Sequence, residues 1–66
     1  MDKKDQLAEL ISNAETSFYN GQLQEAFSLS LSAIKLDENC ADAYQYAANV
    51  CMSLSRYEDA IEYYQK

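Results

Sequence analysis

Apolar residues recur at three- and four-residue steps along most of the chain, in four separate stretches. This spacing puts the apolar residues of a stretch on one face of a helix, so each stretch predicts an amphipathic helix. The first is expected at about residues 4–19, and the others carry apolar positions over 23–36, 43–54 and 57–64. With no proline and one glycine, little interrupts these helices, and the predicted fold class is all-α.

The predicted ends of the helices depend on a few polar residues. Asn20 and Gly21 are the two residue types that most easily take a positive φ, which favours a tight turn after the first helix. Asn39 is expected to end the second helix in a left-handed conformation. Ser55 is expected to be the N-cap of the fourth helix.

Length and charge restrict the classes of function. A chain of 66 residues with 48% hydrophobic residues forms one small domain whose core is too small for an enclosed active site. Eleven acidic and five basic residues give a net charge of −6, the wrong sign for binding nucleic acid. There is no apolar run of signal-peptide or membrane-spanning length, so the predicted location is the cytoplasm, without membrane contact.

The chain has few residues that could carry chemistry. Cys40 and Cys51, eleven residues apart, would lie about 16 Å from each other on one helix, beyond the reach of a disulfide. We interpret both as small buried apolar residues, with a redox role as the alternative. Without histidine, neither a metal site nor a base for a nucleophile is apparent, so we expect no enzyme activity and no cofactor.

The second half of the chain repeats the first at a spacing of about 34 residues, a period typical of helix-turn-helix repeats. The paired positions are similar in size and polarity, although few are identical. Examples are Ala14 with Ala48, Phe18 with Met52, Gly21 with Ser55, Leu23 with Tyr57, Ala26 with Ala60, and Phe27 with Ile61.

The second copy, from Ala41 through the segment 57–66, resembles the tetratricopeptide repeat. The resemblance implies two stacked antiparallel helical hairpins, a fragment of an α-α superhelix. It implies a single domain over 1–66, with repeat one at about 7–40 and an incomplete repeat two at about 41–66. The first copy departs from the family at several places, among them Asn13, Ser17, Ser30 and Glu38.

The resemblance also implies a function, a scaffold for protein–protein interaction that presents a concave groove to a peptide or protein. Because the groove carries acidic residues, we expect a neutral or basic partner and no binding of acidic chaperone tails. The groove residues carried over from the family are Ala8, Ile11, Glu15, Phe18, Tyr19, Asp42, Gln45, Asn49, Met52 and Ser53.

The six tyrosines divide into two groups. One group falls on the apolar stripes and is expected in the core, and the other lies off them and is expected to contact partners. The first group is Tyr44, Tyr57 and Tyr64, and the second is Tyr19, Tyr46 and Tyr63.

A structural role is the alternative function. A repeat array buries its apolar faces only by stacking neighbours, and this chain holds about one and three-quarter repeats. The surface around Ile61 and Tyr64 then lacks a cover. We expect either a part of a longer array or a homo-oligomer, formed by stacking terminal helices or by exchanging a hairpin.

Overall fold

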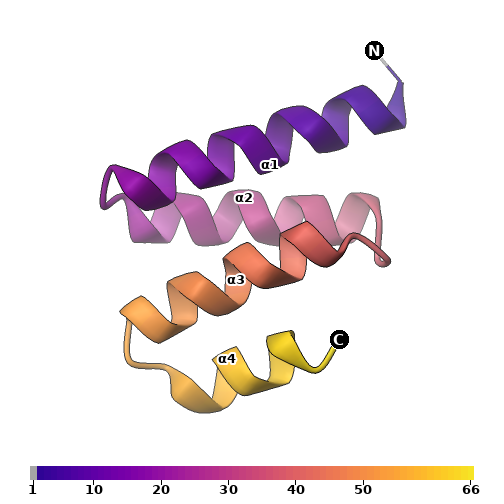
Figure 1. Cartoon of the computed structure of the whole chain (residues 1–66). Helices are drawn as coiled ribbons and strands as arrows, with labels where there is room; N and C mark the ends of the chain where they lie inside the picture. The colour runs from indigo at the N-terminus through magenta and orange to yellow at the C-terminus, as the bar shows by residue number, and fades with distance from the viewer. Residues whose placement is uncertain (1) are drawn as a thin grey trace.

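The computed structural model describes residues 2–66, which form four helices joined by short connections (Figure 1). The helices are α1 (Lys3–Tyr19), α2 (Leu23–Leu36), α3 (Ala41–Ser53) and α4 (Tyr57–Tyr64). Each runs antiparallel to the one before it, and α1 to α4 follow one another down Figure 1. The all-α fold of helical hairpins is therefore confirmed.

The connections α1–α2 and α3–α4 have the same hydrogen bonds at corresponding positions of the two hairpins. The Gly21 N–H donates to the Phe18 carbonyl at 3.1 Å, and the Gln22 N–H donates to the Ser17 carbonyl at 2.9 Å. In the second hairpin the same two bonds run from Ser55 to Met52 (3.1 Å) and from Arg56 to Cys51 (2.8 Å). This pair of bonds defines a Schellman motif, whose central residue needs a positive φ.

Gly21 has φ 80° and Ser55 has φ 62°, and Ser55 is the one non-glycine residue with positive φ in the described chain. The prediction that Ser55 is the N-cap of α4 was wrong, because the Schellman motif occupies that residue. The N-cap is Arg56, which makes no side-chain capping bond.

The connection between α2 and α3 is of a different kind. α2 ends at Leu36, and the C-cap Asp37 has extended backbone angles. The Asp37 carboxylate accepts the Asn39 N–H at 3.0 Å, and the Tyr44 hydroxyl donates to the Glu38 carbonyl at 2.9 Å. The left-handed conformation predicted for Asn39 was wrong, since this side-chain bond turns the chain instead.

Small residues form the centre of the fold. Within residues 2–66 nine apolar residues are fully buried, of which seven are alanines and the other two are Val50 and Cys51. Ser17 and Ser30 are also buried, and the Ser30 hydroxyl donates to the Ala26 carbonyl at 2.8 Å. With such small side chains between them, neighbouring helices can approach closely.

Larger side chains lie around this centre, and here the tyrosine predictions were only partly correct. Tyr57 is 55% exposed and Tyr64 is 54% exposed, so neither belongs to the core. Tyr63, expected on the surface, is half-buried, and its ring packs edge-on against Phe27 at 6.2 Å between centroids. α4 is thus rotated so that Ala60 and Tyr63 face the rest of the protein.

Candidate functional site

The first candidate site is a hollow between α1 and α3, with a volume of about 420 Å³. We call it the α1–α3 hollow. Four of the ten predicted groove residues line it, three from α1 and one from the start of α3. Its lining residues are Lys4, Leu7, Ala8, Ile11, Ser12, Glu15, Cys40 and Asp42.

A hydrogen bond links the two hairpins beside this hollow. The Tyr46 hydroxyl on α3 donates to the Glu15 carboxylate on α1 at 2.6 Å. This bond, together with partial burial and the negative charge of Glu15, raises the pKa of Tyr46 to about 12. The phenol therefore stays protonated to higher pH than an ordinary tyrosine, and it donates to the Glu15 carboxylate at the edge of the hollow.

Two further groove residues extend the site toward the C-terminus of α1. The rings of Phe18 and Tyr19 lie edge to face with centroids 5.5 Å apart. Phe18 is half-buried, whereas Tyr19 is 75% exposed. Tyr19 thus presents most of an aromatic ring to solvent, a surface that protein partners commonly use.

The remaining groove residues, all on α3, are not in the α1–α3 hollow. Asn49 accepts a hydrogen bond from the Tyr64 hydroxyl at 2.5 Å, and Gln45 lines a separate hollow with residues of α4. Met52 and Ser53 are exposed at the end of α3. The predicted groove is therefore divided into a part on the α1–α3 side and a part beside α4.

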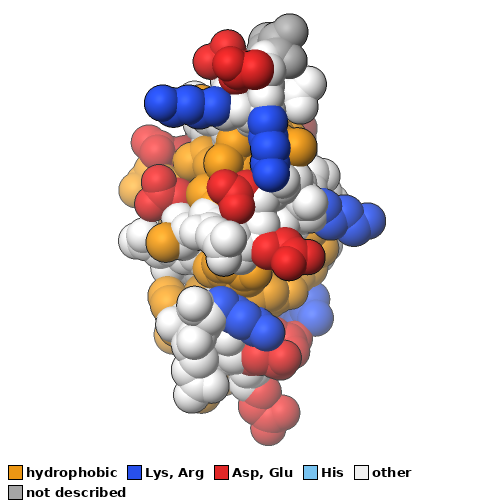
Figure 2. Space-filling model, turned by 90° about the vertical axis from the view of Figure 1, so that its right-hand side faces the viewer, with side chains coloured by type: hydrophobic (Ala, Val, Ile, Leu, Met, Phe, Trp, Pro, Cys, Tyr) orange, Lys and Arg blue, Asp and Glu red, His pale blue; other side chains and the backbone are white. Residues whose placement is uncertain are grey.

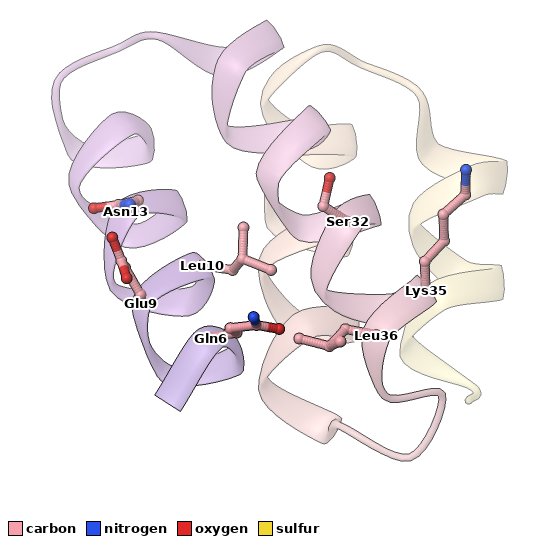
Figure 3. A pocket seen from close by; sticks show the side chains of 7 residues that line it. All are labelled: Gln6, Glu9, Leu10, Asn13, Ser32, Lys35 and Leu36. Carbon is pink, nitrogen blue, oxygen red and sulfur yellow. The ribbon is translucent and has the colours of Figure 1, made fainter. Parts of the chain in front are cut away.

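A second hollow, of about 530 Å³, lies on the outer side of the first hairpin (Figure 3). We call it the outer α1–α2 hollow. Leu10 and Leu36 point into the space between the two helices, and Lys35 extends away from it. This site was not predicted from the sequence, although its α1 residues recur at steps of three and four. Its lining residues are Gln6, Glu9, Leu10, Asn13, Ser32, Lys35 and Leu36.

Cys51 is fully buried, as predicted, but the same prediction for Cys40 was wrong, since Cys40 is only partly buried and lines the α1–α3 hollow. Both cysteines are free, and burial raises the pKa of the Cys51 thiol, which favours its neutral and unreactive form. No group of three or more potential metal ligands occurs within residues 2–66.

Charge is mixed on the surface that carries the chain ends. Figure 2 shows lysine and arginine side chains separated by acidic and apolar ones on that face. In the described part of the chain, no helix has the length and apolar composition that a membrane crossing requires.

These observations define the class of the protein as an all-α pair of helical hairpins with an open hollow on either side of its first helix. In comparisons with known proteins, no family model, curated protein or solved structure matches the chain. Its function is therefore inferred from its residues and their geometry.

Proposed function

We propose that the chain is a protein-binding module of the tetratricopeptide-repeat type, which binds a peptide or protein segment at the α1–α3 hollow. The observation that carries the proposal is the hollow itself, where Ala8 and Ile11 supply apolar surface beside the polar groups of Glu15 and Asp42. An apolar floor with a few fixed polar groups is typical of binding sites. Binding without catalysis or cofactor is part of the proposal.

The charges around the site favour a neutral or basic partner. Glu15 and Asp42 both line the hollow, and Lys4 is the one basic residue that lines it. An acidic tail would approach two carboxylates, in a chain whose net charge is −6. We therefore propose no acidic chaperone tail, nucleic acid or membrane as partner, and we propose the cytoplasm as location because both thiols are free.

The test is a selection of binding peptides from a display library, followed by measurement of their affinity. We expect the selected peptides to be neutral or basic and to perturb the amide signals of α1 and α3. Ile11→Glu should lower their affinity at least about tenfold, because it places a charge on the apolar floor. Peptides that bind Ile11→Glu as tightly as the unchanged protein would contradict the proposal.

A structural role in assembling a larger protein is the second candidate. The observation that favours it is the exposed apolar surface of Tyr57, Ile61 and Tyr64 on α4. Two variants separate the two functions: Phe18→Ala with Tyr19→Ala alters the end of α1, and Ile61→Asp alters the exposed surface of α4. Loss of peptide binding with unchanged oligomeric state supports the binding module, and loss of the oligomer with unchanged peptide binding supports the structural role.

A further inference from the structure

One face of α4 carries three large apolar side chains that are more than half exposed, although the Tyr64 hydroxyl bonds to Asn49 of α3. Tyr57, Ile61 and Tyr64 follow one another at steps of four and three, so they share one face of the helix. We propose that this face, here called the α4 stripe, binds a basic amphipathic helix of another protein.

The first hairpin shows how an equivalent face is covered. The residues of the first repeat that correspond to the α4 stripe are Leu23, Phe27 and Ser30. Ser30 is fully buried, and Leu23 and Phe27 are half-buried. α3 packs along α2, and residues from the second hairpin cover the Phe27 ring. Within the molecule, therefore, α3 and α4 cover such a face together with Arg56, the N-cap of α4.

That cover also brings a positive charge. The Arg56 guanidinium lies over the Phe27 ring, 5.5 Å from its centroid, while Tyr63 meets the ring edge-on. A guanidinium over an aromatic ring is attracted to the electron-rich face of the ring. The α4 stripe offers two such rings, those of Tyr57 and Tyr64, to a cation on an incoming helix.

Acidic residues beside the stripe also select for a basic helix. Glu58 and Glu62 lie one turn apart on α4 and are exposed, about 100° around the helix from the stripe. Within residues 2–66 the ion pair that forms is Arg56 with Asp59, at 2.8 Å, so neither glutamate has a cationic partner there. Lysine or arginine residues spaced by one turn on an incoming helix would match both carboxylates.

A second copy of this chain fits the stripe less well. Stacked head to tail, it would present the outer face of α1, where Glu9 and Asn13 hold the places that the fully buried Ala43 and Ala47 hold in the second repeat. A buried, unpaired Glu9 beside an acidic helix would be unfavourable. Two α4 stripes packed face to face and antiparallel would bring their acidic flanks together. The occupant is therefore a helix of different composition.

The test uses three synthetic peptides of about fifteen residues. The first has leucines on one helical face and lysines on one flank, the second has glutamates in place of the lysines, and the third is a scramble of the first. We expect the first to bind at least about tenfold more tightly than the others at low salt, with a dependence on ionic strength. In NMR spectra of the isotope-labelled chain, the amide signals that this peptide changes should centre on α4.

Variants of the chain test the apolar α4 stripe and the two glutamates beside it separately. Ile61→Asp should abolish binding, with an unchanged circular dichroism spectrum as proof of folding. Glu58→Gln with Glu62→Gln should weaken binding about tenfold and remove most of its salt dependence. The matched control, Glu25→Gln with Glu38→Gln, also removes two exposed negative charges from the net charge of −6 and should leave the affinity unchanged.

Three results would overturn the inference. They are equal binding of the acidic peptide, equal weakening by the control pair, and self-association through α4 that the basic peptide does not displace. The α4 stripe is separate from the α1–α3 hollow. Perturbations confined to α1 and the start of α3 would therefore overturn the inference while supporting the proposed function.

Discussion

The two hairpins reach the same turn geometry with different residues and receive different amounts of cover. In the first, glycine takes the positive φ, and α2 lies between α1 and α3. In the second, Ser55 takes the positive φ, and the shorter α4 packs mainly along α3, with Tyr63 reaching Phe27 of α2. The backbone geometry of the turn thus repeats, whereas the packing against neighbouring helices does not. We infer that the second hairpin is the weaker half and the one that gains more from a binding partner.

The largest expected effect concerns the paired alanines Ala26 and Ala60, both fully buried. Ala26→Leu should lower the free energy of unfolding by about 3 kcal/mol, because α2 is held on two sides and cannot move to admit the added volume. Ala60→Leu should cost about 1 kcal/mol, since α4 can shift toward its open side. Urea denaturation followed by circular dichroism measures both. Equal losses would show that the two hairpins are equally constrained.

The next largest effect is expected when the turn residues Gly21 and Ser55 are exchanged. Ser55→Gly should raise the free energy of unfolding by somewhat less than about 1 kcal/mol, because it removes the strain of a left-handed serine. Gly21→Ser should lower it by about 1 kcal/mol, although no atom lies within 4 Å of the added Cβ. Thermal unfolding of the two single variants and of the double exchange tests this. A stabilising effect of Gly21→Ser would contradict the shared turn geometry.

The smallest effect concerns the bond that joins the hairpins. Tyr46→Phe removes the hydrogen bond to Glu15 and should lower the free energy of unfolding by about 0.5 kcal/mol at pH 7. Tyr19→Phe, on a side chain that is 75% exposed, is the control and should have no effect there. Chemical denaturation at pH 7 compares the two.

The same bond has a signature at alkaline pH. The pKa of Tyr46 is raised from 10.0 to about 12 in the folded protein, so its stabilising contribution is complete below pH 10 and is lost as the pH rises toward 12. The unchanged protein should therefore lose more stability than Tyr46→Phe over this range. Parallel losses in the two proteins would show that the bond does not couple the hairpins.

The sequence was sufficient for the presence and extent of the helices, because an apolar period of 3.6 residues is typical of an amphipathic helix. The first helix, expected at about 4–19, is observed at Lys3–Tyr19. The repeat spacing reappears in the hydrogen bonds of the two turns. These features depend on residues close together in the chain.

Sequence reasoning failed where an apolar position could face either of two neighbours. Tyr57 and Tyr64 lie on an apolar stripe, but that stripe is the open face of α4, whereas Tyr63 packs inward on Phe27. Periodicity identifies a face without identifying what covers it. The division of the predicted groove had the same cause, since Asn49 bonds to Tyr64 of a helix that packs on the other side of α3.

The alanine-rich centre has a consequence for how the protein opens. Alanine loses no side-chain entropy on burial but contributes little apolar area, so no single interior residue anchors the fold. In hydrogen–deuterium exchange, we expect the amides of α2 and α3 to share one slow rate near that of global unfolding, while those of α4 exchange sooner. A helix docked on α4 would slow that early exchange and make the terminal helix open together with the rest.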